Sequence, residues 1–257
     1  MKSAGKYQYA GIIPARYASF RFPGKPLALI GSKPMVQMVY EQAAKKLDLV
    51  FVATDDERIY NTVKNFGGRA IMTSSAHQSG TDRCAEAVKA ISDITGTKID
   101  IVINIQGDEP FIKPDQIGLL MNCFEDESVE IATLIRIAGV SEDIFNPNQP
   151  KVIINTYGDA IYFSRAAIPY LRDVEKSKWP EVHVFYKHIG LYAYKTKILK
   201  KITQLNRSPL EISESLEQNR WIENGFRIRT AVTSWESLGV DTPEDLERAK
   251  MLLESFT

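Results

Sequence analysis

Three cationic side chains lie close together near the start of the chain, in the stretch IIPARYASFRFPGKPL. Arg16, Arg21 and Lys25 directly follow an apolar run that ends at Pro14. Cations on a loop can neutralise the charge of phosphate groups. The pattern G-x-G-x-x-G is absent, and Lys25 is followed by Pro26 rather than by the Ser or Thr of a Walker A loop. The loop therefore predicts an anion site built from long side chains; three solvated surface cations are the alternative.

Two acidic residues far apart in the sequence could complete such a site. Asp108 lies in VINIQGDEPFI, where an apolar run ends in turn residues, and Asp241 lies in GVDTPEDL, just before an expected helix. Mg²⁺ is usually held by one or two carboxylates together with substrate oxygens and water. An ordinary turn at Asp108 and a favourable helix-dipole position for Asp241 are the alternatives. If the chain brings both acids together, they form a metal site for phosphate chemistry.

A third motif, SGTDR, could add ligand contacts at the start of a helix. Gly80 would let backbone N–H groups approach a ligand closely, and Arg83 could reach out from the first turn. Helix initiation and ligand binding can coexist here. His77, His183 and His188 lack the spacing of zinc ligands, and no G-x-S-x-G motif supplies a nucleophile. From its surroundings alone, His188 would be an ordinary strand histidine.

The first half of the chain alternates short apolar runs with helical patterns. Tyr9–Ile13, Leu49–Ala53 and Ile99–Ile105 predict buried parallel strands, because each is almost continuously apolar. Thr54 and Glu57 predict a capping box for one helix, and Ser79 or Thr81 predicts the start of another. This alternation indicates a doubly wound α/β sheet. Arg16 and Asp108 would then lie at its carboxyl edge, where such sheets bind ligands.

The pattern changes in the second half. Ile131–Ile135 and His188–Tyr194 are strand-like, and Lys151–Asn155 with Ala160–Phe163 predict a hairpin. Residues 137–195 are therefore expected to form a smaller mixed α+β lobe, inserted in one domain that spans 1–257. A helix capped by Ser208 and Glu211 is expected to end at Gly225, and a last helix to begin at Thr242.

The composition excludes several classes of protein. The 257 residues include 32 Lys and Arg against 32 Asp and Glu, so there is no basic excess for generic nucleic-acid binding. No apolar stretch approaches the ~20 residues that span a bilayer. The two cysteines form neither a disulfide framework nor a zinc pattern. These features favour a cytoplasmic protein without a membrane or nucleic-acid partner.

Taken together, the motifs resemble one family closely, the 3-deoxy-manno-octulosonate (Kdo) cytidylyltransferases, also called CMP-Kdo synthetases. The matching stretches occur in order and span nearly the entire chain from Ile12. They are IIPARYASFRFPGKPL, ATDDERI, HQSGTDR, NIQGDEPFI, FNPN, YFSRAAIP, HIGLYAY, SPLE, SLEQ and VDTPEDLE.

The resemblance implies a nucleotidyltransferase-like Rossmann variant that joins CTP and Kdo to give CMP-Kdo and pyrophosphate for lipopolysaccharide assembly. It implies Mg²⁺ as cofactor and a homodimer formed through the smaller lobe. Its catalytic residues would be Lys25, Arg16 and Asp108, with Mg²⁺ on Asp108 and Asp241. The triphosphate would face Arg16, Arg21 and Lys25, and the cytidine Gly80, Arg83 and Gln106. The sugar acid would contact Arg165, His188, Tyr192, Glu217 and Gln218.

Some positions depart from the family pattern. Phe20 and Phe22 flank Arg21 where smaller or aliphatic side chains are usual, and Asn219 replaces a usual Leu. The same core motifs would suit an acceptor such as 8-amino-Kdo, and a sialic acid cytidylyltransferase is a further alternative. A non-catalytic nucleotide-binding module is disfavoured by the intact Lys25, Asp108 and Asp241. A nicotinamide oxidoreductase is disfavoured by the missing glycine pattern.

Overall fold

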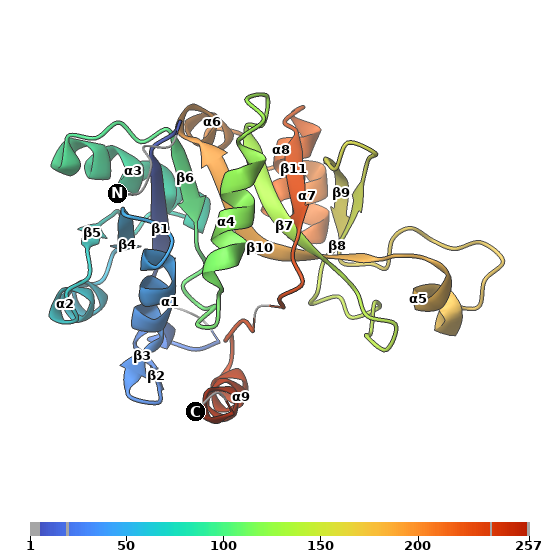
Figure 1. Ribbon diagram of the computed structural model, residues 1–257, viewed down its shortest axis with the longest axis horizontal. Helices are drawn as coiled ribbons and strands as arrows, with labels where there is room; N and C mark the ends of the chain where they lie inside the picture. Colours follow the sequence, from blue (N-terminus) through green and yellow to red (C-terminus); the bar gives the residue numbers. More distant parts are fainter. Residues whose placement is uncertain (1–5, 19–20, 237, 256–257) are drawn as a thin grey trace. The chain divides into compact units, whose positions relative to one another are not determined.

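The computed structural model describes residues 6–18, 21–236 and 238–255 (Figure 1). The chain divides into two compact units. Unit 1 comprises residues 1–117, 194–203 and 237–257, and unit 2 comprises 118–193 and 204–236. The segment expected as an inserted lobe, residues 137–195, falls largely within unit 2.

A parallel sheet forms the centre of unit 1. The strands of this unit are β1 (Tyr9–Ala15), β2 (Leu29–Ile30), β3 (Lys33–Pro34), β4 (Val50–Thr54), β5 (Ala70–Met72) and β6 (Ile101–Asn104). The order β6-β1-β4-β5 is parallel throughout, while β2 and β3 form a separate antiparallel pair. The three strands predicted for this region are confirmed as β1, β4 and β6, and every residue of β4 and β6 is buried.

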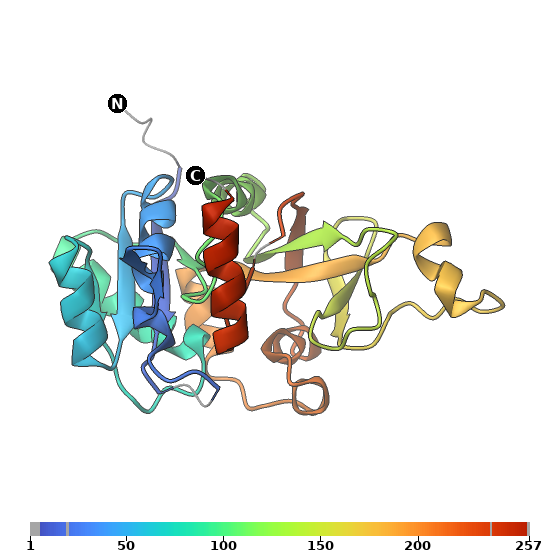
Figure 2. The ribbon, with the colours of Figure 1, turned by 90° about the horizontal axis from the view of Figure 1, so that it is seen from below.

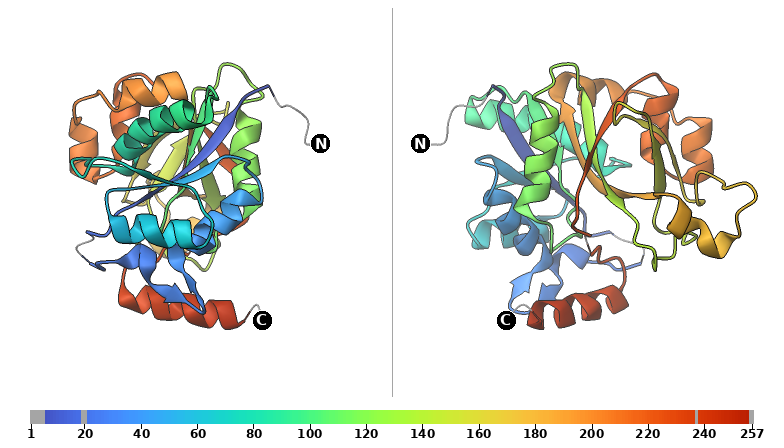
Figure 3. Two further views of the ribbon diagram at one scale, coloured as in Figure 1. Left: turned by 90° about the vertical axis from the view of Figure 1, so that its left-hand side faces the viewer. Right: turned by 45° about the vertical axis from the view of Figure 1, so that its right-hand side comes forward.

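Helices alternate with these strands as the sequence predicts, which confirms the doubly wound α/β class. Those between the strands are η1 (Lys25–Leu27), α1 (Met35–Ala44), α2 (Glu57–Asn65) and α3 (Gly80–Thr95). Unit 1 also contains α6 (Thr196–Ile202) and α9 (Pro243–Glu254), and α4 (Pro114–Cys123) extends from unit 1 into unit 2. Helix α1 lies in the connection from β1 to β4, which moves across the sheet toward β5. Helix α3 lies in the connection from β5 to β6, which moves across the sheet in the opposite direction. Right-handed crossovers therefore place α1 and α3 on opposite faces of the sheet (Figure 3, left).

The N-terminal caps of three helices can be compared with those predicted from the sequence. Ser79 with Asp82 caps α3, and Thr242 with Asp245 caps α9, as the motifs predict. The prediction for α2 is wrong, because its N-cap is Asp56 rather than Thr54. The Asp56 carboxylate accepts from the Arg58 backbone N–H at 2.9 Å, while Thr54 is the last residue of β4.

A separate apolar cluster holds α9 beside the β2–β3 pair (Figure 3). Its buried members are Ile30, Met35, Phe111, Val240 and Ala249. Phe22 packs against this cluster, so its aromatic ring has a structural role beside the cationic loop. Phe20 lies outside the described residues.

Unit 2 combines a mixed set of strands with short helices. Its elements are β7 (Ile131–Ile137), β8 (Lys151–Ile154), β9 (Ala160–Ser164), most of β10 (Tyr186–Lys195), β11 (Ile228–Val232), η2 (Lys176–Lys178), α5 (Trp179–Val182), α7 (Pro209–Glu214) and α8 (Glu217–Glu223). Strand β7 pairs with β11 in parallel, and β8 pairs antiparallel with both β9 and β10. The predicted β8–β9 hairpin is confirmed.

The C-terminal helical region of unit 2 differs from the prediction of one helix. Ser208 and Glu211 form the predicted capping box of α7, and Gly225 follows α8 with a φ of 80°. Between them, Ser215 adopts a left-handed conformation with a φ of 53°, which ends α7 and separates it from α8. The sequence gives little warning of this break, since neither Gly nor Pro lies at the junction.

A small aromatic cluster lies in the region of α5, whose ribbon is golden in Figure 2. Trp179 stacks on Phe185 with ring centroids 6.1 Å apart and packs with buried Ile144. Around it, Tyr170, Val182 and Val184 are exposed to solvent. Within the described part of the chain, no helix is long and apolar enough to cross a membrane.

One buried ion cluster ties β7, β10 and the loop after β7 together. Glu142 accepts two hydrogen bonds from the Arg136 guanidinium, at 2.6 and 2.7 Å, and pairs also with Lys187. The Gly139 backbone N–H donates to the same carboxylate at 2.9 Å. The hydrogen bonds from Arg136, followed by those from Lys187 and Gly139, outweigh the effect of burial and lower the pKa of Glu142 to about 2.

This cluster predicts a pH-dependent stability of unit 2. Because the pKa of Glu142 is lower in the folded state, its contribution is complete above the ordinary pKa of about 4.5 and is lost as the pH falls toward 2. Because the Glu142 side chain is partly exposed and solvent screens its ion pairs, the stabilisation that disappears is about 1–2 kcal/mol. Urea unfolding of Glu142→Gln between pH 7 and pH 3 should show a flatter profile than that of the unsubstituted protein. Identical slopes would contradict the assignment.

Candidate functional site

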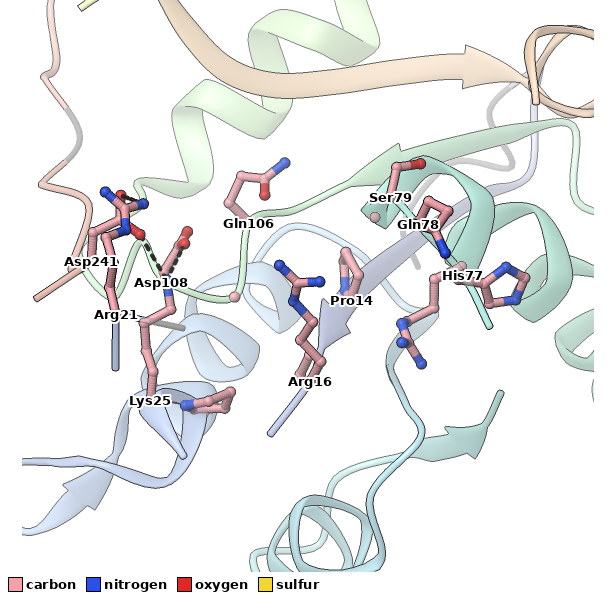
Figure 4. Close-up of a pocket in the computed structure, with 15 residues that line it drawn as sticks. Pro14, Arg16, Arg21, Lys25, His77, Gln78, Ser79, Gln106, Asp108 and Asp241 are labelled. Carbon is pink, nitrogen blue, oxygen red and sulfur yellow. Dashed lines mark hydrogen bonds and ion pairs between the residues drawn. The ribbon is translucent and has the colours of Figure 1, made fainter. Parts of the chain in front are cut away.

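A cavity of about 330 Å³ opens at the carboxyl edge of the unit 1 sheet (Figure 4). All of its lining residues belong to unit 1. They are Pro14, Ala15, Arg16, Arg21, Lys25, Pro26, His77, Gln78, Ser79, Gly80, Arg83, Gln106, Gly107, Asp108 and Asp241. The structure thus brings together in one cavity every residue that was predicted to face the nucleotide or the metal.

The strongest polar contact in this cavity joins Lys25 to two carboxylates. Its ammonium donates to Asp108 Oδ2 at 2.6 Å and to Asp241 Oδ1 at 3.0 Å. Arg21 pairs with the other oxygen of Asp241, Oδ2, at 3.0 Å. Figure 4 shows these contacts as dashed lines at one end of the cavity. Three of the four carboxylate oxygens are therefore bound by cations of the loop.

Backbone contacts explain how residues 133 positions apart meet here. The Val240 backbone N–H donates to the Asp108 carbonyl at 2.8 Å, which brings the two turns together. The Asp241 backbone N–H in turn donates to Asp245 of the α9 capping box at 3.0 Å. The cationic loop has its own backbone constraint at Gly24, which precedes η1. Gly24 has a φ of 74°, a backbone conformation that residues with L side chains rarely adopt. This turn precedes Lys25, the first residue of η1.

The charge of Lys25 is fixed by its surroundings. Burial alone would lower the pKa of Lys25, but Asp108 and, more weakly, Asp241 outweigh that effect and raise the pKa above its ordinary value. The side chain is only 14% exposed, so the ion pairs are partly shielded from water. Lys25 therefore stays charged at neutral pH and beyond.

Arg16 takes a different position from Lys25. It follows β1 and projects toward the middle of the cavity, between Gln106 and the His77–Ser79 segment (Figure 4). The chain approaches itself closely at this point, since a Cβ on Gly107 would lie 3.0 Å from the Pro14 carbonyl oxygen. A glycine at 107 thus lets the turn after β6 lie against the end of β1.

The Arg83 guanidinium is fixed by hydrogen bonds to two residues that were not predicted from the sequence. It is almost fully buried and donates to Thr73 Oγ1 at 2.6 Å and to Asp55 Oδ2 at 3.1 Å. A Cβ on Gly80 would lie 3.1 Å from the Pro14 ring, so the start of α3 is also tightly placed. Asp55 belongs to the stretch ATDDERI, which was among the matched motifs without a role being given to it.

His77 and Gln78 also line the cavity, although the histidine spacing had argued against a role for His77. The His77 imidazole pairs with Glu86 of α3, which also accepts from the Ser74 backbone N–H at 3.0 Å. These contacts fix the segment that leads into α3. The only feature of the sequence that could have indicated His77 and Gln78 as cavity residues is that they directly precede SGTDR.

The residues predicted to contact a sugar acid all lie in unit 2. His188 and Tyr192 of β10 are in contact, with ring centroids 5.3 Å apart, and Tyr192 also packs edge-on against Trp221. Burial raises the pKa of Tyr192 well above its ordinary value, and the charge of nearby Glu217 adds to this effect. Glu217 itself pairs with Arg220 at 2.8 Å.

His188 hydrogen-bonds to a buried hydroxyl. Its Nε2 lies 3.0 Å from Thr133 Oγ1, and that hydroxyl lies 3.0 Å from the Leu191 carbonyl oxygen. Burial lowers the pKa of His188 to about 3, so the ring is neutral at pH 7. A neutral imidazole offers one hydrogen-bond donor and one acceptor.

Arg165 and Gln218 lie apart from these contacts. Arg165 donates to the Glu214 and Pro147 carbonyl oxygens at 2.7 and 3.0 Å, and to that of Ser215 at 3.3 Å. Its side chain thus connects segments of unit 2. Gln218 is 5% exposed, and its Nε2 has no hydrogen-bond partner among the residues that the structure describes.

Known proteins with similar sequences identify the family of the chain. A family model described as "Cytidylyltransferase" matches residues 10–230. A 3-deoxy-manno-octulosonate cytidylyltransferase of Parabacteroides distasonis is 54% identical, with 96% of this chain and 98% of the relative covered. The chain belongs to the 3-deoxy-manno-octulosonate cytidylyltransferase family. The family predicted from the motifs is thereby confirmed.

Two further relatives carry the same name. That of Bacteroides thetaiotaomicron is 52% identical over 96% of this chain and 99% of its own length. That of Thermodesulfovibrio yellowstonii is 49% identical over 96% and 98%.

Solved structures agree with this family. The structure of a CMP:2-keto-3-deoxy-manno-octonic acid synthetase complexed with CTP matches with a TM-score of 0.87 and 41% identity, covering 97% of this chain and 100% of the other. A cytidylyltransferase of Leptospira borgpetersenii, 19% identical with a TM-score of 0.63, covers 98% of this chain and 88% of its own and shows the shared fold alone.

The neutral state of His188 can be measured directly. We expect the ¹⁵N chemical shifts of its ring to report a neutral imidazole throughout pH 5–8, because burial disfavours the charged form. His183, which is exposed, provides an internal comparison in the same spectra. An imidazole at position 188 that titrates near pH 6.5 would contradict the described environment.

Proposed function

We propose that the chain transfers CMP from CTP to Kdo and releases pyrophosphate, for use in lipopolysaccharide assembly. The observation that carries this proposal is the convergence of Lys25, Asp108 and Asp241 in one cavity of a chain that belongs to the Kdo cytidylyltransferase family. A cationic loop and a pair of carboxylates suit a polyphosphate substrate handled with a divalent cation.

The nucleotide would occupy the cavity of unit 1. Arg16, Arg21 and Lys25 would neutralise the triphosphate, where other folds use glycine-rich backbone. At the other end, Gly80 and Arg83 would receive the cytidine, with Gln106 contributing an amide. Arg83 is well prepared for this task, since Asp55 and Thr73 already fix its guanidinium.

Magnesium fits the donors that the cavity offers. The two carboxylates of Asp108 and Asp241 converge on a single cationic atom, Lys25 Nζ, and hard oxygen ligands of this kind suit Mg²⁺. No cluster of three or more His, Cys, Asp or Glu side chains with metal-binding geometry occurs among the described residues, so substrate oxygens and water would complete the coordination. When bound, the ion would supply positive charge to the reacting phosphate oxygens.

The reaction itself needs no protein nucleophile. The anomeric C2 hydroxyl of Kdo would attack the α-phosphorus of CTP and lose its proton to water. The bond between the α-phosphorus and the oxygen that bridges to the β-phosphorus would break, and pyrophosphate would leave with that oxygen. Catalysis then depends on orientation and on neutralising charge. Arg16 and Lys25 would stabilise the negative charge that develops on the leaving group.

The acceptor contacts are proposed for unit 2. His188 is neutral, so it would offer hydrogen bonds to sugar hydroxyls rather than a charge for the carboxylate. Gln218 has a buried amide that could donate to the same ligand. Tyr192 and Glu217 would form the surrounding polar wall. Arg165 is the cationic member of this predicted set, although three of its donors are bound to carbonyl oxygens.

A homodimer in the cytoplasm completes the proposal. The exposed apolar side chains of Tyr170, Val182 and Val184 surround the Trp179 cluster of unit 2. An apolar surface of this kind is suited to association with a second copy.

The experiment that tests the function is pyrophosphate release from CTP. Purified protein with Mg²⁺ is offered Kdo, 8-amino-Kdo or sialic acid as acceptor. We expect turnover with Kdo, and Asp108→Asn should lower kcat by roughly 100-fold or more because charge stabilisation at the reacting phosphate is lost. Asp93→Asn, at an exposed position of α3, is the matched control and should retain full activity.

Other results would revise the proposal in specific ways. Preferred turnover of 8-amino-Kdo or sialic acid would change the acceptor but keep the reaction. Binding of CTP without pyrophosphate release from any acceptor would favour a non-catalytic module. Full activity in Asp108→Asn would contradict the role given to this carboxylate.

A further inference from the structure

Lys25 and Arg21 already occupy oxygens that a divalent cation held by Asp108 and Asp241 would use. The Lys25 Nζ contacts Asp108 Oδ2 and Asp241 Oδ1, while Arg21 contacts Asp241 Oδ2. Both oxygens of Asp241 are therefore paired with a side-chain cation. A divalent cation held by both acids would have to share or displace one of these contacts, and the ammonium would repel it.

We propose that Lys25 competes with the divalent cation for Asp108 and Asp241, and that the triphosphate of the nucleotide resolves this competition by drawing the ammonium away. The inference rests on the proposed function, since it concerns the metal and the nucleotide of that reaction. It assigns Lys25 a second task besides phosphate contact: it sets the order in which nucleotide and metal enter the site.

The charges in the cavity support this order. Asp108 and Asp241 are balanced by Lys25 and Arg21, so these four groups sum to zero. A dication added to them would leave two excess positive charges beside two cationic side chains, with Arg16 close by. A triphosphate brings enough negative charge to offset all of them. Nucleotide binding therefore makes metal binding electrostatically favourable.

The geometry allows Lys25 to change partners. It begins the short helix η1 just after Gly24, and it lines the same cavity as Arg16. Its ammonium is carried on a flexible four-carbon stem, so rotation of the side chain alone can carry the charge toward a phosphate group. The backbone segments that carry the two carboxylates are held in place, because the Val240 N–H donates to the Asp108 carbonyl and the Asp241 N–H donates to Asp245.

Binding of Mn²⁺ to the nucleotide-free protein tests the competition without any turnover. Electron paramagnetic resonance counts free Mn²⁺ during a titration of the unsubstituted protein, of Lys25→Met and of Lys33→Met. Lys33 is the matched control, since it forms an exposed ion pair with Glu41 at 2.6 Å. We expect Lys25→Met to bind Mn²⁺ about tenfold more tightly, as the loss of a competing and repelling charge implies. Lys33→Met should match the unsubstituted protein.

A second measurement excludes a merely damaged fold. In the presence of EDTA, calorimetry should show that Lys25→Met binds metal-free CTP more weakly, since a phosphate contact is gone. Opposite changes, tighter Mn²⁺ and weaker CTP, are the signature of competition, whereas misfolding would weaken both.

Unchanged or weaker Mn²⁺ binding in Lys25→Met overturns the inference. That result would leave the proposed function standing if pyrophosphate release by the unsubstituted protein is observed. Lys25→Met combined with Asp108→Asn should lose the gain in Mn²⁺ affinity, and retention of the gain would also overturn the inference, because it would place the metal elsewhere.

Discussion

The site of unit 1 depends on one shared ammonium group. Lys25 joins Asp108 and Asp241, two carboxylates that come from opposite halves of the sequence, and it is shielded enough for those ion pairs to be strong. Without that charge the two partly exposed carboxylates would repel each other. With it, the loop after β1, the turn after β6 and the start of α9 become one structural unit.

The fold supplies the rigidity that this arrangement needs. Parallel strands β1 and β6 lie side by side, so the segments that follow them leave the sheet at the same edge. The Val240–Asp108 backbone hydrogen bond and the α9 capping box then fix the second acid. Phe22 of the cationic loop packs against the apolar cluster around Met35 and Val240. Lys25, Asp108 and Asp241 therefore extend from backbone segments that hydrogen bonds hold in place.

Much of this could be predicted from the sequence, for identifiable reasons. Continuous apolar runs identify buried parallel strands, and capping motifs such as Thr242–Asp245 identify helix starts. The meeting of Asp108 and Asp241 could only be suspected, because it depends on a tertiary hydrogen bond. Asp55 and Thr73 were missed because a residue that only positions another cavity-lining residue, here Arg83, has no local sequence pattern. The break at Ser215 was missed because a non-glycine residue adopts positive φ there.

The most direct test of this account is a double-mutant cycle on Lys25 and Asp108. The free energy of unfolding is measured for Lys25→Met, for Asp108→Asn and for the double variant. If the ammonium and the carboxylate stabilise each other, the double variant should lose less stability than the two single losses combined, with a coupling free energy of about 1–3 kcal/mol. Losses that add to within about 0.5 kcal/mol would show that the two groups act independently and would contradict the account.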